Sequence, residues 1–186
     1  MTTRRELEHC YDALTALPQG WESWDDLMRI AMEEAQKAEA IGEVPVGAVL
    51  VAPDGTIVAK DYNKTITSND PTAHAEILAM RKAGEQLQNY RIEDLVLVVT
   101  LEPCLMCSGA MVHARIRGVV YGAPDLKTGA LDSQLNSFDL PLHNHAIWHK
   151  SGVLQEECST MLSAFFKKRR KEIKAAKKSQ KTQSTS

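Results

Sequence analysis

Two short segments of this chain together carry a complete set of metal-binding side chains, which limits the folds open to it. They are His74-Ala75-Glu76 and Pro103-Cys104-Leu105-Met106-Cys107. One imidazole and two thiolates suit Zn²⁺, and three protein ligands leave the fourth tetrahedral position open, as in catalytic zinc sites. Glu76 adds a carboxylate that does not have to bind the metal and can act as a general base. We therefore predict a catalytic zinc site formed by His74, Cys104 and Cys107.

The two cysteines also have a purely structural interpretation, a zinc knuckle that only holds the fold. Such a site usually takes four protein ligands, so Cys10 or Cys158 would have to supply the fourth. The combination of H-x-E with P-C-x-x-C is specific and favours the catalytic interpretation. For Glu76 the alternative is an acid that merely suits the positive end of a helix dipole.

Helix geometry alone does not place Glu76 beside the metal. Pro103 suits the first turn of a helix that carries both cysteines, and residues three apart project from the same side of a helix. His74 and Glu76 are two apart, so they would not share a face of a regular helix. The position of the Glu76 carboxylate is therefore left open by the spacing.

The pattern of apolar residues predicts an α/β domain. Ser23 followed by Asp26 is typical of a helix start, and Gly42 is typical of a helix end. Apolar runs predict strands at 44–51, 56–61, 95–101, 119–121 and 147–149. Further helices are expected at 73–86, from 103 and from 155. This order predicts three layers, α/β/α, around a central mixed sheet of about five strands.

The chain is long enough for one domain with a sizeable core. We expect an N-terminal extension at 1–22, the domain at 23–178 ending in a basic helix, and a flexible polar tail at 179–186. The N-terminus lacks the apolar run of a secretory signal, and no segment approaches the ~20 apolar residues of a membrane span. In such a chain, cysteines favour metal binding over disulfides. A cytoplasmic protein without a membrane partner is expected.

The formal net charge of −2 conceals an uneven distribution of charge. Residues 167–181 contain nine basic residues and one acidic residue, Glu172. A basic end on an acidic body indicates a polyanionic partner. The alternative is a solvated helix end, where cations also suit the dipole, but the excess of charge is larger than capping requires.

The zinc motif resembles the zinc-dependent cytidine and adenosine deaminase superfamily, for which it is a signature. Several other segments are similar to bacterial tRNA-specific adenosine deaminases: 43–49, Asn63, 70–76, 100–104, 106–107, 109–111 and 127–130. The resemblance covers about residues 25–178. It implies a cytidine-deaminase-like fold and a homodimer with the active site near the interface.

The resemblance further implies hydrolytic deamination of adenosine to inosine at the wobble position of an arginine tRNA anticodon. One Zn²⁺ per subunit, held by His74, Cys104 and Cys107, would activate water. Glu76 would carry the proton of this water to the ring and then to the departing amine. Asn63 would contact the flipped nucleoside, which is already largely unstacked in an anticodon loop.

Two more groups of residues acquire a role through the resemblance. Asp125 lies in a segment similar to a substrate-facing loop, although an Asp that forms a turn after Pro124 is equally expected. The basic helix would follow RNA phosphates. Its candidate RNA contacts are Lys167, Lys168, Arg169 and Arg170. Phe165 and Phe166, just before them, are interpreted as core residues rather than platforms for base stacking.

The chain departs from the family pattern outside the zinc motif. Leu131-Asp132 stands where the family usually has Gly-Ser, and Ala146 stands where it has an arginine. These differences concern loop shape and RNA contacts rather than the chemistry. Two other functions remain open. One is deamination of a free base or nucleoside, which needs no basic tail; the other is a non-catalytic, zinc-stabilised RNA-binding domain.

Overall fold

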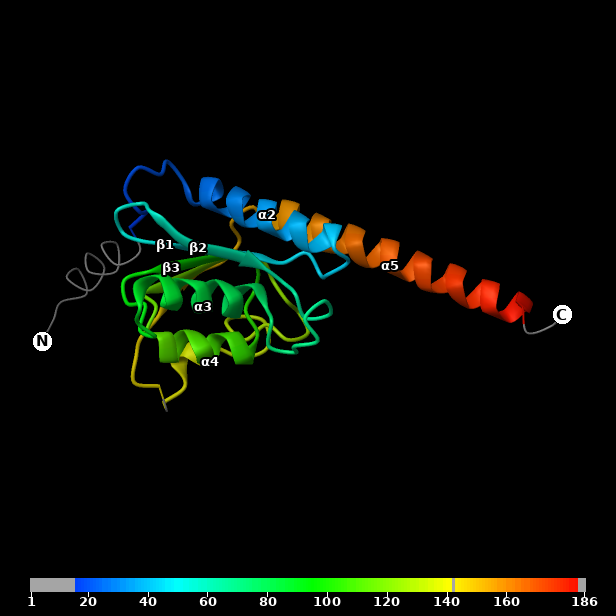
Figure 1. Ribbon diagram of the computed structural model, residues 1–186. Helices are drawn as coiled ribbons and strands as arrows, with labels where there is room; N and C mark the ends of the chain where they lie inside the picture. Colours follow the sequence, from blue (N-terminus) through cyan, green and yellow to red (C-terminus); the bar gives the residue numbers. More distant parts are fainter. Residues whose placement is uncertain (1–15, 142, 184–186) are drawn as a thin grey trace, which may run out of the picture.

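The computed structural model describes residues 16–141 and 143–183. A five-stranded mixed sheet forms its centre (Figure 1). In spatial order the strands are β2 (Ile57–Tyr62), β1 (Gly47–Val51), β3 (Val96–Leu101), β4 (Gly118–Ala123) and β5 (Trp148–Lys150). Strand β1 is antiparallel to β2 and β3, whereas β3, β4 and β5 run parallel.

Helices cover both faces of this sheet (Figure 1). One face carries α2 (Trp24–Ala40) and the first part of α5 (Gln155–Gln183), and the other carries α3 (Ala75–Leu87) and α4 (Leu105–Ala114). A short 3₁₀ helix (Ser137–Asp139) lies in the segment between β4 and β5. The predicted α/β/α architecture with a mixed sheet of five strands is confirmed.

The central strands are apolar along their whole length because helices lie on both of their faces. Every residue of β1 is buried, and so are the first five residues of β3. Gly47 shows how closely α2 approaches β1: a Cβ atom there would lie 2.0 Å from the carbonyl oxygen of Ala31. This glycine therefore sets the distance between the outer helix and the sheet.

The predicted boundaries of the first helix are confirmed. Ser23 is the N-cap of α2, and its side chain and that of Asp26 form a reciprocal capping box. Gly42 follows the helix at φ +83°, a conformation that glycine adopts without strain. Strand β1 begins later than predicted, at Gly47 rather than at residue 44. Pro45 lacks the N–H that a ladder would require, which explains the delay.

Part of the predicted N-terminal extension is attached to the domain. The N–H of Gln19 donates to the carbonyl of Pro53, and the indole of Trp21 donates to the carbonyl of Gly55, both at 2.9 Å. These bonds fix residues around 19–21 against the turn between β1 and β2. Residues 1–15 of the predicted extension lie outside the described part of the chain.

Helix α5 extends well beyond the sheet (Figure 1). All residues from Phe166 to Ala176 are exposed. The helix also contains residues 179–183, which we expect from the sequence to belong to a flexible polar tail; residues 184–186 lie outside the described part. Among the described helices, none has the length and apolar character needed to cross a membrane.

Candidate metal centre and active site

The three predicted metal ligands meet at one point. The ligand atoms of His74, Cys104 and Cys107 all lie within 4.8 Å of one another. Nδ1 of His74 lies 3.8 Å from Sγ of Cys104 and 3.5 Å from Sγ of Cys107. Tetrahedral Zn²⁺ bonds of about 2.3 Å to sulfur and 2.0–2.1 Å to nitrogen would separate such atoms by about 3.6 Å. The donors and their spacing therefore fit zinc.

The predicted four-ligand alternative receives no support from Cys158. This cysteine is buried, and its sulfur packs against Gly122 of β4, where a Cβ atom would lie only 2.5 Å away. It is not part of the ligand group. Cys10 lies outside the described residues.

Backbone conformation at the two helix starts explains how the group assembles. His74 is the N-cap of α3 and Cys104 is the N-cap of α4, and both have extended backbones. His74 and Glu76 are therefore not two positions of one regular helix, which removes the geometric difficulty raised by their spacing. The expectation that Pro103 opens the helix and that both cysteines lie in its first turn is wrong in detail. Helix α4 begins at Leu105, so only Cys107 lies within that turn.

The two thiols of the ligand group differ in pKa. A hydrogen bond from the Cys107 thiol, assisted by the His74 imidazole, lowers the pKa of Cys104 to about 4 despite partial burial. The same bond raises the pKa of Cys107, whose thiol stays protonated and donates to the Cys104 sulfur. Cys104 therefore lies in surroundings that favour the thiolate form, which is the form that binds a metal.

Glu76 lies beside the ligand group but is not a member of it. Its side chain is 4% exposed, and this burial raises the pKa of its carboxyl, while the positive field of His74 acts in the opposite direction. A carboxyl with a raised pKa is a stronger base than an exposed one, and it can accept a proton from water. The environment of Glu76 therefore suits the predicted role in proton transfer.

A pocket of about 520 Å³ opens onto these residues. Its size falls within the range of small-molecule sites. It lies where the parallel strands β3 and β4 end, the edge of an α/β sheet at which ligands commonly bind. The residues that line it are Val44, Val46, Asn63, Thr65, His74, Glu76, Leu101, Glu102, Cys104, Pro124, Asp125, Leu126, Lys127, Thr128, Leu162 and Phe166.

Asn63 lies in the pocket wall, and its expected contact with a nucleoside stays a prediction. Its side-chain oxygen accepts a hydrogen bond of 2.9 Å from the backbone N–H of Ala75, the first residue of α3. The oxygen is thereby committed to the protein. The amide NH₂ is the part of Asn63 that can still donate to a ligand.

Asp125 lies both in the pocket wall and in a turn, and its contact with a substrate stays a prediction. It lines the pocket, and its carboxylate also forms a turn by accepting bonds from the N–H groups of Lys127 and Thr128 and from the Thr128 hydroxyl. Burial raises the pKa of Asp125, but these hydrogen bonds outweigh it and leave the pKa below its usual value. The Asp125 carboxylate is therefore ionised and held in place by its own loop.

Helix α5 contributes two pocket residues that the sequence analysis misses. Phe165 is buried, as predicted, but Phe166 is exposed and lines the pocket together with Leu162. The interpretation of both phenylalanines as core residues is therefore wrong for Phe166. Leu162 and Phe166 are four residues apart on the helix, a spacing that places them on one face and is visible in the sequence.

The four basic residues predicted to contact RNA follow Phe166 directly on α5. Their side chains are all exposed, and Arg169 forms an ion pair of 3.6 Å with Glu172. The exposed basic segment therefore begins at the edge of the pocket. The residues are Lys167, Lys168, Arg169 and Arg170.

The departure at Leu131-Asp132 forms intramolecular contacts. Leu131 is fully buried, and the Asp132 carboxylate accepts a hydrogen bond from the Tyr121 hydroxyl and lies 3.0 Å from Nε2 of His149. Neither Leu131 nor Asp132 lines the pocket. The other departure, Ala146, lines a separate hollow with Trp148 and neighbouring residues.

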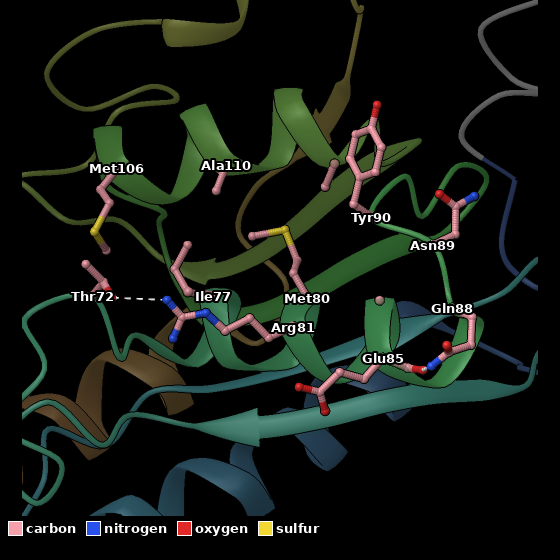
Figure 2. A pocket seen from close by; sticks show the side chains of 12 residues that line it. Thr72, Ile77, Met80, Arg81, Glu85, Gln88, Asn89, Tyr90, Met106 and Ala110 are labelled. Atoms are coloured by element: carbon pink, nitrogen blue, oxygen red, sulfur yellow. Dashed lines mark hydrogen bonds between the residues drawn. The ribbon is translucent and has the colours of Figure 1, made fainter.

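A second hollow, of about 710 Å³, lies between α3 and α4 (Figure 2). Its lining is mostly apolar and includes Ile77, Met80 and Ala110, with Tyr90 and Met106 exposed around it. Figure 2 also shows Arg81 reaching across to Thr72, to whose hydroxyl it donates a hydrogen bond of 3.3 Å. These two helices begin next to His74 and Cys104, so the hollow lies on the helical layer that carries the ligand group.

Comparison with known proteins identifies the family of this chain. Residues 22–123 match the cytidine and deoxycytidylate deaminase zinc-binding region. The chain is 52% identical over 153 residues to the tRNA-specific adenosine deaminase of Haemophilus influenzae, covering 82% of this chain and 88% of that protein. It is 48% identical over 151 residues to the tRNA-specific adenosine deaminase of Bacillus subtilis, covering 81% and 93% respectively.

A solved structure agrees with these sequence relatives. It comes from a study of A-to-I editing by tRNA:A34 deaminases at the wobble position of transfer RNA. It is 45% identical in sequence, superimposes with a TM-score of 0.70, and covers 72% of this chain and 96% of its own. With its zinc-type ligand group and a buried glutamate beside it, the chain belongs to the tRNA-specific adenosine deaminase family of zinc-binding deaminases.

Proposed function

We propose that this protein converts adenosine to inosine at the wobble position of a tRNA anticodon, with an arginine tRNA as substrate. The observation that carries this proposal is the buried carboxylate of Glu76 beside the ligand group, at a pocket of about 520 Å³. The names of its relatives support tRNA as the substrate. Such a substrate places the activity in the cytoplasm, and we assign it to residues 23–178.

His74, Cys104 and Cys107 would hold one Zn²⁺ per subunit. The bound metal would act as a Lewis acid that makes water nucleophilic at neutral pH. Glu76 accepts the proton of the attacking water, passes it to the purine ring, and then supplies a proton to the leaving amine. One water is consumed and one ammonia released for each inosine formed. The burial of Glu76 supports this role because it raises the pKa of the carboxyl, which makes the carboxylate a better proton acceptor.

The pocket residues would hold the flipped base. Asn63 donates its amide NH₂ to an acceptor on the nucleoside, since its oxygen already accepts from Ala75. Val46, Leu162 and Phe166 supply apolar surface for the purine. Asp125 and the three residues that follow it complete the lining. An anticodon loop suits this pocket because its bases are accessible without melting a duplex.

The basic part of α5 would bind the phosphates of the same RNA. It begins immediately after Phe166, so an RNA whose base occupies the pocket passes close to it. Exposed lysine and arginine side chains gain affinity by releasing counterions from the RNA. The proposed contacts are Lys167, Lys168, Arg169 and Arg170.

The α3–α4 hollow supports a homodimer. Tyr90 is 71% exposed and Met106 is 37% exposed, which is unfavourable for large side chains around an apolar surface. A second copy of the same chain, related by a two-fold axis, would cover this surface in both subunits at once. Because His74 and Cys104 are the N-caps of α3 and α4, such an interface would also support the metal centre.

The proposed function is tested by incubating the zinc-loaded protein with a transcribed anticodon stem-loop of arginine tRNA, and separately with free adenosine and free cytosine. We expect inosine only at the wobble adenosine of the stem-loop. Deamination of a free base with an intact stem-loop would contradict the tRNA substrate and assign the protein to small-molecule deaminases. Tight RNA binding without any deamination would contradict an enzymatic role.

A further inference from the structure

The pocket has two irregular walls, and each is held by one buried glutamate. One wall belongs to the loop after β2, which carries Asn63 and Thr65. The other belongs to the loop after β4, residues 124–133, which carries Asp125. We propose that Glu43 and Glu102 are positioning residues that hold these walls at the separation the substrate needs. This inference rests on the proposed function.

The carboxylate of Glu102 accepts hydrogen bonds from both ends of the loop after β4. Its Oε1 accepts from the backbone N–H groups of Leu131, Asp132 and Ser133 at 3.1, 2.8 and 2.9 Å. Its Oε2 accepts from the N–H of Asp125 at 3.0 Å and from the Ser133 hydroxyl. Five donors thus converge on a side chain that is 2% exposed, so the loop is closed around a single charge.

The same loop is also fixed to the segment that carries Cys104. The N–H of Ala130 donates to the carbonyl of Pro103 at 2.9 Å, and Gly129 forms a β-bridge with Cys104. A Cβ atom on Gly129 would lie 2.3 Å from Oε2 of Glu102, so the loop passes directly over the carboxylate. Glu102 therefore couples the position of the Asp125 wall to the start of α4.

Glu43 plays the corresponding part on the other wall. It is fully buried just after α2, and its Oε1 accepts from the N–H of Thr67 at 2.6 Å. Its Oε2 accepts from the Thr65 hydroxyl at 3.2 Å. Thr65 itself lines the pocket. This glutamate thus holds the loop between Asn63 and His74. Asn63, at the N-terminal end of this loop, supplies the proposed contact with the base.

Glutamine is the appropriate substitution at both positions. It keeps the size of the side chain, but it has one acceptor oxygen instead of two, and its NH₂ would face backbone donors. We expect Glu102→Gln to retain one zinc per chain and to lower kcat/KM for the stem-loop about 10- to 100-fold, as for groups displaced by about 1 Å. Hydrogen exchange should quicken at the amides of Asp125 and residues 131–133.

Glu43→Gln should lower kcat/KM in the same way, and it should quicken hydrogen exchange only in the loop that contains Thr67.

Glu34→Gln is the matched control. Glu34 is 3% exposed and loses ion pairs with Lys37 and Lys60 on substitution, but it does not line the pocket. We expect a lower Tm with kcat/KM unchanged.

Ser133→Ala is a milder test of the same wall. It removes one donor to Glu102 without changing any charge. The variant should fold, and its kcat/KM should fall less than that of Glu102→Gln.

The outcomes separate this inference from the proposed function. If the parent protein forms inosine and both glutamine variants keep kcat/KM within about twofold while only Tm falls, the positioning role is overturned and the proposed function stands. Unchanged loop hydrogen exchange in the variants would overturn the role as well. A parent protein that forms no inosine in the stem-loop would overturn the proposed function, and the positioning role with it.

Discussion

The side-chain oxygen of Asn63 accepts a hydrogen bond of 2.9 Å from the backbone N–H of Ala75. One side chain therefore belongs both to the pocket wall and to the start of α3, directly beside His74. The bond uses one lone pair of this oxygen, and the NH₂ group of Asn63 is the donor that it offers to a ligand. Loss of the helix contact and loss of the ligand contact can consequently be separated by mutation.

Asn63→Asp keeps an oxygen for the Ala75 N–H but removes the NH₂ donor and adds a negative charge. We expect a Tm close to that of the parent protein and a fall in kcat/KM of at least about 100-fold, since a polar group on the base is left unpaired. Asn63→Ala should lose activity and also about 1 kcal/mol of stability, as when a helix cap is removed. Kinetics on the stem-loop and thermal unfolding test both expectations. Equal activity of the Asp variant and the parent would exclude Asn63 as a donor.

Glu76→Gln should nearly abolish turnover without releasing zinc. Glu76 is separate from the ligand group, so the metal keeps its three protein donors. A glutamine cannot take a proton from water, and removal of a general acid–base group costs about 10²- to 10⁴-fold. Metal content measured on the same sample as inosine formation decides the question. Near-normal turnover would remove Glu76 from the mechanism, and loss of zinc would make its role structural.

Charged substitutions in the α3–α4 hollow should convert a dimer into monomers. Ala110→Glu and Tyr90→Glu each place a carboxylate on the apolar surface shown in Figure 2, where a second copy would have to bury it. Sedimentation velocity measures the mass in solution. Ile41→Glu, at an exposed apolar residue next to the end of α2, is the control and should leave the mass unchanged. A parent protein that sediments as a monomer at micromolar concentration would contradict this interface.

Acid should remove a specific contribution to stability at Asp61. Burial raises the pKa of Asp61, but hydrogen bonds from Lys64 and Lys82 and from the N–H of Tyr62 outweigh it, so the pKa in the folded state is lowered. A lowered pKa stabilises the fold above the unfolded value of about 3.9, and the contribution disappears as the pH falls through the folded value. Asp61→Asn should therefore cost about 2 kcal/mol at pH 7, and the cost should become smaller as the pH falls below the unfolded value. Urea unfolding at pH 7 and at a series of acidic pH values measures the difference; a cost that is independent of pH would contradict it.

The ligand group could be predicted from the sequence because three chemically distinctive residues occupy two short motifs. The position of Glu76 could not, because it depends on the extended backbone of His74, which precedes α3. Spacing arguments assume that both residues lie in the helix. The pocket position of Phe166 could not be predicted either, because apolar character does not distinguish a core position from a pocket wall at the edge of the domain.

The positioning role proposed for Glu102 could not be predicted from the sequence, for a different reason. Its hydrogen-bond partners are 23 to 31 residues further along the chain, in a segment without regular structure. No periodic pattern encodes such contacts, since they depend on how the loop after β4 closes over the end of β3. The fold, in contrast, followed from apolar runs and helix caps, which are local signals.

The basic segment of α5 should make RNA affinity depend on salt. Each phosphate neutralised on a single strand contributes a slope of about −0.7 in log K against log salt. Single alanine substitutions at Lys167, Lys168, Arg169 and Arg170 should each weaken binding of the stem-loop and reduce the slope by about that amount where the residue contacts a phosphate. Arg29→Ala, whose charge lies 3.2 Å from Glu157, is the control with the same change in net charge. Fluorescence anisotropy across a salt series gives both quantities, and an affinity that does not change with salt would exclude phosphate binding by this helix.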